Sequence, residues 1–300
     1  MLIGAHISAA GGVINAPDNA KKHGAECYQF FSRSPQGGKA SKLTDSIIKE
    51  FKEKNKKYKF EDYYIHAPYY INLASSKNNI YFGSISVLRE ELERGTRLGA
   101  QGMMFHIGSA KDMPSRDAIY RVSKGLREVV KGYKGSCQPL LEISAGAGNI
   151  IGDSFEEIAE IIKKVEGGSG LALGSAKSRN AAPGRTWSQQ GFGVCFDTAH
   201  AFASGYDLRD KKSVTKTFNE FDKIIGLKRL KLIHVNDSKT DLGSRKDRHE
   251  HIGKGKIGLA GFKAIIQNKK LKKINLILET PTDAGILKDI KLLKRLRDTR

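Results

Sequence analysis

The sequence predicts an α/β protein of the (β/α)8 barrel class, and three observations support this prediction. Eight short apolar runs alternate with amphipathic stretches along the whole chain. Most of the runs end on a histidine, an aspartate or a glutamate followed by turn residues. The chain has 300 residues, and a barrel of this kind needs about 250. Alternation of this type is typical of parallel strands covered by helices.

The eight apolar runs are the expected strands. Each spans five to seven residues, which is the length of strands buried on both faces. They cover residues 2–7, 27–31, 63–67, 102–107, 139–144, 193–198, 230–236 and 274–280. Apolar residues recur at helical spacing between them, which predicts helices over 46–58, 86–99, 118–132, 154–165 and 214–226. Ser154 with Glu157 forms a capping-box pattern, and Gly99 stands where a helix should end.

Residues 167–191 interrupt the alternation of expected strands and helices. The segment is rich in Gly, Ser, Ala and Asn and connects the fifth expected helix to the sixth strand. In a parallel barrel, helix-to-strand connections lie at the face opposite the chemistry. We therefore expect a single TIM-barrel domain over residues 1–300 with a tolerated insertion at about 167–191, in which Leu171, Leu173 or Trp187 docks one end.

The chain is strongly basic. It holds 52 Lys and Arg against 32 Asp and Glu, a formal net charge of +20. A cationic surface concentrates polyanions, so a nucleic acid is a plausible partner. The same charge can instead serve only solubility, or the lysine enrichment can reflect codon bias. Charge alone does not decide between these interpretations.

The cysteines and the apolar segments bear on the compartment. Cys27, Cys137 and Cys195 are odd in number and lack C-x-x-C spacing, which argues against a disulfide framework and a thiolate zinc site. The start MLIGAHISAAGG has no basic region before an apolar core, and no apolar run reaches the length of a membrane span. We therefore expect a cytoplasmic protein without a membrane segment.

The chemistry-bearing residues indicate a multinuclear metal centre. Nine side chains able to bind metals stand at or after strand ends: His66, His106, Glu142, Asp197, His200, His234, Asp247, His249 and Glu279. The carboxyl ends of parallel barrel strands converge on one face. A lone histidine at a strand end is usually a core residue, and a lone glutamate there is usually a salt-bridge partner. Neither explanation accounts well for six strands that all end on a possible metal ligand. Divalent ions would offset the cost of burying these carboxylates together.

Strand alternation provides a test of this arrangement, because residues two apart share a face. Tyr64, Met104, Leu140, Leu232 and Ile277 each precede a candidate ligand by two and should point into the barrel. Cys195 precedes Asp197 by two, so we expect a buried thiol rather than a ligand. Imidazole and carboxylate ligands suit Zn²⁺, with Mn²⁺ or Fe²⁺ as substitutes. Nine ligands with a shared carboxylate indicate three ions.

At these residues the sequence resembles the endonuclease IV family of zinc-dependent apurinic/apyrimidinic endonucleases. The similarity runs from LIGAHISAAGG through FHIGS and GVCFDTAHAFASGYD to LILETP, and HVNDSK followed by GSRKDRH is its most specific part. The resemblance implies that His66, His106 and Glu142 hold the first zinc. It places Glu142, Asp197, His234 and Glu279 on the second, and His200, Asp247 and His249 on the third.

The resemblance also implies a substrate and a reaction. The substrate would be double-stranded DNA with abasic sites, cut 5′ to the lesion to leave a 3′-hydroxyl and a 5′-deoxyribose phosphate; removal of 3′-blocking groups would use the same site, with Glu142 as the central catalytic residue. Gln36 stands where many members have an arginine that inserts into DNA. Ile143, Ser144 and Ala199 also depart from the family pattern, and none of the departures removes a ligand.

Contacts to DNA are expected from the strand-to-helix loops. Tyr69 and Tyr70 could wedge into the base stack at a missing base, or simply pack on the barrel rim. Basic residues in these loops would grip phosphates: Arg33, Lys39, Lys111, Arg116, Lys239, Arg245, Lys246, Arg248, Lys254 and Lys256. We expect the protein to act as a monomer.

Two other functions remain open from the sequence. A metal-dependent sugar isomerase or epimerase of related barrel architecture would place carboxylates and histidines at the same strand ends. Such an enzyme needs neither a basic rim nor a third ion, because its substrate is neutral. The second alternative is a metal-dependent DNA-binding protein without turnover, for which Ile143 and Ser144 are the only indication.

Overall fold

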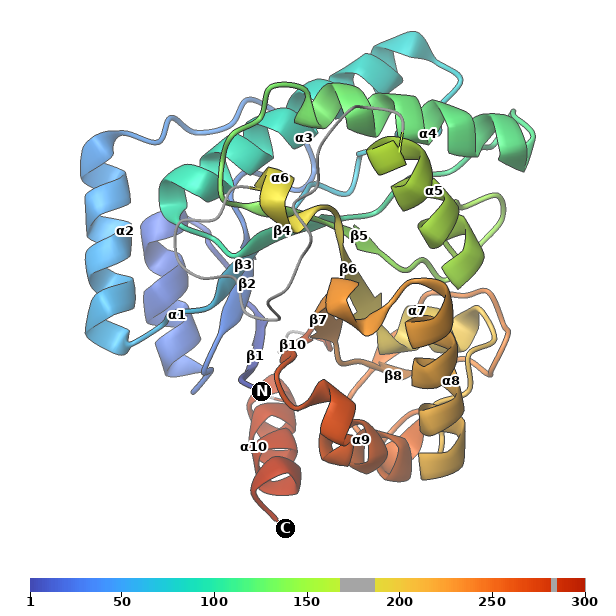
Figure 1. The fold of residues 1–300 in the computed structure, drawn as a ribbon. Helices are drawn as coiled ribbons and strands as arrows, with labels where there is room; N and C mark the ends of the chain where they lie inside the picture. Colours follow the sequence, from blue (N-terminus) through green and yellow to red (C-terminus); the bar gives the residue numbers. More distant parts are fainter. Residues whose placement is uncertain (168–186, 282–284, 300) are drawn as a thin grey trace.

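The structure, a computed structural model, describes residues 1–167, 187–281 and 285–299. Its centre is a closed barrel of eight parallel strands in the order β1-β10-β7-β6-β5-β4-β3-β2 (Figure 1). The barrel strands are β1 (Ile3–His6), β2 (Tyr28–Phe31), β3 (Tyr63–His66), β4 (Gly102–Phe105), β5 (Gln138–Glu142), β6 (Gly193–Asp197), β7 (Leu230–His234) and β10 (Asn275–Leu278). Each lies inside one of the eight expected runs or starts one residue before it. The predicted fold class is confirmed.

The inside of the barrel is filled as strand alternation predicts. Tyr64, Met104, Leu140, Leu232 and Ile277 form one buried cluster with Cys27 and Cys195. This cluster lies beneath the strand ends, and the larger apolar core lies between the strands and the surrounding helices. Burial raises the pKa of the Cys195 thiol to about 12, so it stays protonated at neutral pH. All three cysteines are buried free thiols.

Helices surround the strands (Figure 1). They are α1 (Ala16–Lys22), α2 (Asp45–Tyr58), α3 (Asn78–Leu98), α4 (Ser115–Val130), α5 (Phe155–Gly167), α6 (Trp187–Gln190), α7 (Thr198–Ala203), α8 (Lys211–Ile224), α9 (Gly258–Gln267) and α10 (Gly285–Asp298). The helix expected at 86–99 starts earlier, at Asn78, and ends before Gly99, whose φ of 89° suits glycine. Ser154 Oγ accepts from the backbone N–H of Glu157, as the capping pattern predicted.

A small hairpin stands outside the barrel, after β7. Strands β8 (Asp237–Ser238) and β9 (His249–Glu250) pair antiparallel. The loop between them packs on α7, because the N–H groups of Gly243 and Arg245 donate to the carbonyls of Phe202 and Ala203. The hairpin therefore holds the segment around Asp247 over the end of β6.

The Gly- and Ser-rich insertion is anchored at both described ends. Residues 168–186, with Leu171 and Leu173, lie outside the described residues. On one side, Glu166 pairs with Arg229. On the other, Trp187 is buried and its ring stacks on Tyr133. Both anchors lie beside the amino-terminal ends of β5, β6 and β7, which is the face predicted for this connection.

Deleting residues 170–184 and closing the gap with two or three glycines should leave the barrel intact. We expect the melting temperature, the metal content and the abasic-DNA incision implied by the resemblance to change little, because Glu166 and Trp187 remain. A control deletion that also removes Trp187 should cost about 3–5 kcal/mol of stability, the usual penalty for losing a buried aromatic side chain. A shorter variant that folds and keeps its metals yet loses incision would show that the segment reaches DNA.

Within the three described ranges, no helix is both long and apolar enough to cross a membrane.

Candidate metal centre

The nine predicted ligands meet at one end of the barrel. Six stand at a strand end or one residue beyond it: His66 on β3, His106 after β4, Glu142 on β5, Asp197 on β6, His234 on β7 and Glu279 after β10. His200 lies in α7, and His249 lies in β9, two residues after Asp247. Because the strands are parallel, their carboxyl ends all lie at the same end of the barrel.

Glu142 is the centre of the arrangement. It is fully buried, and its two carboxylate oxygens face different neighbours. Oε2 lies 3.2 Å from His66 Nε2 and 3.4 Å from His106 Nε2. Oε1 lies 3.0 Å from His234 Nδ1. A carboxylate placed in this way can bridge two cations.

A second group surrounds the other side of Glu142. His234 Nδ1 lies 3.1 Å from Glu279 Oε2 and 3.7 Å from Asp197 Oδ2. One donor atom from each of Glu142, Asp197, His234 and Glu279 falls within 4.8 Å of all the others. Three carboxylates and one imidazole form a compact anionic pocket of the kind that binds a divalent ion.

The third group lies at the outer edge. Asp247 contacts both histidines of this group, with Oδ2 3.1 Å from His200 Nε2 and Oδ1 3.2 Å from His249 Nε2. Asp197 also lies close, because its Oδ2 is 3.7 Å from His249 Nε2. Asp247 is the exposed member, with 48% of its side chain accessible. The structure thus brings all nine residues to one place, and the third compact group of donor atoms contains Asp197 with His200 and His249. Asp247, which the prediction placed in this group, contacts both histidines from the exposed side.

The hydrogen bonds of the histidines match those of metal ligands. His66, His200 and His249 each place Nδ1 against a backbone carbonyl, of Ala67, Ile143 and Glu279 respectively, at 2.6–3.1 Å. A carbonyl can only accept, so Nδ1 carries the proton and Nε2 offers its lone pair to the cluster. A histidine whose second nitrogen is held in this way is the usual form of a metal ligand.

Several donor atoms have no hydrogen-bond partner, which is a second sign of a metal site. Among the described residues, Glu142 Oε2, His200 Nε2 and His249 Nε2 are buried without a hydrogen bond of acceptable geometry. The short nitrogen–oxygen distances to these atoms are contacts, and their angles do not suit a proton. Buried polar atoms are rarely left unpaired, and a cation would satisfy all three.

The electrostatics of the cluster fit the same conclusion. Burial by itself would lower the pKa of His200, yet the carboxylates of Asp197 and Asp247 raise it well above the ordinary histidine value. Burial would also lower the pKa of His234, but the Cys195 sulfur and the Glu279 and Glu142 carboxylates raise it well above that value. Burial would raise the pKa of Glu142, but His106 and His234 hold it well below its usual range. The carboxylates thus stay ionised and their charge must be balanced by protons on imidazoles or by bound cations. These residues fit divalent metal ions.

Sequence reasoning did not identify Asn236, a side chain that holds two of the ligands. Asn236, fully buried in HVND, donates from Nδ2 to Asp197 Oδ2 at 2.7 Å and accepts from the Glu279 N–H at 2.7 Å. Asp197 Oδ1 accepts from the His200 N–H, so Asp197 is also the N-cap of α7. The Asp-x-x-His spacing could have revealed this cap, because an N-cap residue bonds to the third residue after it.

The aromatic candidates lie at the rim of the centre. Tyr69 is 58% exposed, although its ring lies 5.7 Å from that of His66 and 5.1 Å from that of Phe31. Tyr70 is 39% exposed, and Gly37 lies against its ring. Gln36 is therefore in an exposed loop beside Tyr70. Tyr69, next to His66 and His106, therefore forms one edge of the metal centre. Tyr70 follows it in the chain, and Gln36 is exposed in the loop that contains Gly37.

The basic candidates that follow β7 lie on the opposite edge, because β7 stands across the closed barrel from β3. Arg245, Lys246 and Arg248 are exposed in the β8–β9 loop that carries Asp247. Arg33 differs from expectation: its side chain is 5% exposed and pairs with Glu90 and Glu91 of α3. Arg33 is therefore not available to grip a phosphate. Its charge is neutralised within the fold, which a sequence pattern cannot show.

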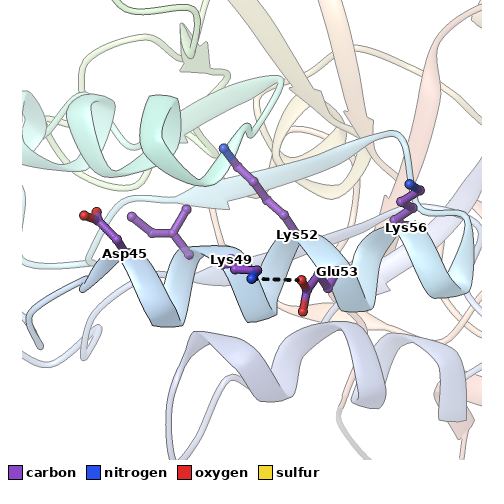
Figure 2. A pocket seen from close by; sticks show the side chains of 6 residues that line it. Asp45, Lys49, Lys52, Glu53 and Lys56 are labelled. Atoms are coloured by element: carbon purple, nitrogen blue, oxygen red, sulfur yellow. Dashed lines mark ion pairs between the residues drawn. The ribbon is translucent and has the colours of Figure 1, made fainter.

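A pocket on α2 lies away from these residues. Its lining consists of one helix face, and Lys49 pairs with Glu53 across it at 3.9 Å (Figure 2). It contains none of the predicted ligands or DNA-binding residues. We assign it no role.

A closed parallel barrel with clustered carboxylates and imidazoles at its carboxyl end defines a class of metal-binding barrel enzymes. Comparison with known proteins agrees. A family described as "Xylose isomerase-like TIM barrel" matches residues 17–174 and 182–296. A protein named "Probable endonuclease 4" from Halothermothrix orenii is 38% identical over 297 residues, covering 99% of each chain.

Solved structures show the same relationship. Endonuclease IV from Thermus thermophilus superposes with a TM-score of 0.81 at 26% identity, covering 99% of this chain and 98% of that chain. A D-tagatose 3-epimerase-like protein has a TM-score of 0.70 at 18% identity, covering 99% and 97%; this likeness shows the fold alone. The chain belongs to the endonuclease IV family, and the prediction that it is an enzyme is confirmed.

Proposed function

We propose that the protein is a DNA-repair endonuclease that hydrolyses the phosphodiester 5′ to abasic sites with a trinuclear zinc centre. The products would be a 3′-hydroxyl and a 5′-deoxyribose phosphate, and the same site would clean 3′-blocked ends. One observation carries this proposal: eight donor side chains converge in three compact groups, two of which share Glu142, and Asp247 contacts both histidines of the third. The chain is also related to proteins named endonuclease 4 over nearly its full length.

The three groups would each hold one ion. His66, His106 and Glu142 would bind the first, and Glu142, Asp197, His234 and Glu279 the second. His200, Asp247 and His249 would bind the third. Zinc suits this set of imidazoles and carboxylates, and Mn²⁺ or Fe²⁺ could replace it. Bound ions would supply Lewis acidity, activate water and neutralise charge on the phosphate.

The side chains around the centre bind and orient the DNA. Asp247, the exposed member of the third group, lies between Lys246 and Arg248 in the chain. A phosphate bound by these two basic side chains would therefore lie beside the residues that hold the third ion. Arg245 extends the same edge. On the other edge Tyr69 presents an aromatic face beside His66 and His106, where it can fill the space of a missing base. Tyr70 and Gln36 would continue this contact along the strand.

Product analysis tests the function. A duplex with one abasic site is incubated with the zinc-loaded protein, and both ends of the cut are identified. We expect incision only at the lesion, with a 3′-hydroxyl that a polymerase extends without further treatment. The same duplex without a lesion is the control. Tight binding of abasic DNA without any incision would instead support the DNA-binding protein that lacks turnover.

Salt dependence separates a DNA substrate from a neutral sugar. Binding of abasic DNA should weaken steeply with salt, and Arg245→Ala or Lys246→Ala should lower the slope of log K against log[salt] by about 0.9 for each lost phosphate contact. Lys49→Ala, which changes a lysine on the outer face of α2, is the matched control and should leave the slope unchanged. A flat response would favour the epimerase alternative, and sugar epimerisation should then be assayed.

Further predictions concern the whole molecule. We propose that the chain works as a single domain over residues 1–300, because the closed barrel uses strands from both ends of the chain: β1 pairs with β10. A monomeric state and a cytoplasmic location also remain predictions.

A further inference from the structure

Gln29 is a polar side chain in the barrel interior, on the middle of β2. It is fully buried, while its neighbours along the strand, Tyr28 and Phe30, are apolar and point to the helices. Its register partner is His6 on β1. The alternation that places Cys27 inside the barrel places Gln29 one layer higher, at the floor of the metal centre.

Every hydrogen-bonding group of the Gln29 amide apart from one acceptor lone pair is in use. Nε2 lies 2.6 Å from Glu279 Oε1 and 2.8 Å from His6 Nδ1. Oε1 lies 2.7 Å from His234 Nε2. An ionised carboxylate can only accept, so the NH2 group must face Glu279 and the oxygen must face His234. The opposite amide orientation would set two oxygens against each other at the first contact.

This orientation fixes the tautomer of His234. Because Gln29 Oε1 can only accept, His234 carries its proton on Nε2 and directs the Nδ1 lone pair toward Glu142 and Glu279. His66, His200 and His249 do the reverse, with Nδ1 held by backbone carbonyls. His234 therefore differs from these three histidines: a side chain, and not a backbone carbonyl, holds the nitrogen that faces away from the ligands.

We propose that Gln29 is a positioning residue of the metal centre, whose amide sets the metal-binding nitrogen of His234 and holds the Glu279 carboxylate for the same ion. The proposal rests on the proposed metal-dependent function. β2 supplies none of the nine ligands. Through Gln29 it would nevertheless determine how tightly the protein holds the ion bound by Glu142, Asp197, His234 and Glu279.

Zinc release tests this assignment without DNA. The zinc-loaded protein is mixed with an excess of a chromogenic chelator, and the rate of each release phase is recorded. Gln29→Met keeps the side-chain volume but removes all three hydrogen bonds. One release phase should accelerate by about 10- to 100-fold, the usual effect of removing the partner of a metal ligand.

Gln138→Met is the matched control. Gln138 is also buried in a barrel strand and donates to the carbonyl of Gly191 at 2.8 Å, but it lies at the opposite end of the barrel. This variant should lose similar stability while its zinc release stays at the wild-type rate. If both methionine variants release zinc equally fast, or if Gln29→Met releases it at the wild-type rate, the proposal is wrong.

A second variant protects the test against a folding failure. Gln29→Glu keeps the volume and polarity and can still accept from His234, but it sets a carboxylate against Glu279. It should also accelerate one phase of zinc release, and a wild-type rate would contradict the proposal. A wild-type protein that fails to cut abasic DNA, while Gln29→Met still speeds zinc release, would contradict the proposed nuclease function alone.

Discussion

Replacing Glu142 with glutamine is expected to lower the incision rate by about three orders of magnitude or more, equal to a barrier increase of about 4 kcal/mol. The two oxygens of Glu142 face separate ligand groups at 3.0–3.4 Å. A neutral amide offers one acceptor oxygen and no charge, so it cannot hold both groups. Among the residues that the structure describes, no other carboxylate belongs to both of these groups.

Binding of abasic DNA should survive this substitution, because the basic and aromatic edges of the opening are untouched. Asp289→Asn is the control: Asp289 is a buried carboxylate on α10 that accepts from Thr280 and contacts His251, and it is not a predicted ligand. It should lower stability with a far smaller effect on incision. The incision rates of both variants and of the wild type are measured under single-turnover conditions on a labelled duplex. A near-normal rate for Glu142→Gln would contradict the assignment of Glu142 as the shared metal ligand.

Removal of the metal should abolish incision altogether. We expect close to three zinc ions per chain by elemental analysis after extensive dialysis, and loss of all activity after treatment with a strong chelator. The metal-free protein should also melt at a lower temperature, since ions that bind only the folded state stabilise it by mass action. Glu142 and Asp197 are fully buried, and they would then depend on protonated imidazoles for charge balance.

Added Zn²⁺ should restore both the melting temperature and the incision rate, which separates metal loss from irreversible unfolding. Added Mg²⁺ serves as the control, because it prefers oxygen ligands and retains its waters. A fully active protein with one or two ions per chain would contradict the trinuclear assignment while leaving the nuclease function in place.

The sequence by itself determined the strands and the face that each residue occupies. Strand alternation is a local property with a period of two, so Leu140 and Glu142 share the interior wherever β5 lies. The predicted interior residues, from Tyr64 to Ile277, form the observed cluster for this reason. The position of a ligand at a strand end is equally local, because the turn residues follow directly in the chain.

Only the tertiary structure decided which atoms of the converging side chains meet, and which other side chains contact them. Gln29 and His234 are 205 residues apart, and their contact depends on how the closed barrel sets the stagger of its strands. The same closure aims the two oxygens of Glu142 at different groups and buries Arg33 between carboxylates of α3. These contacts arise from packing between distant segments, and local periodicity contains no information about them.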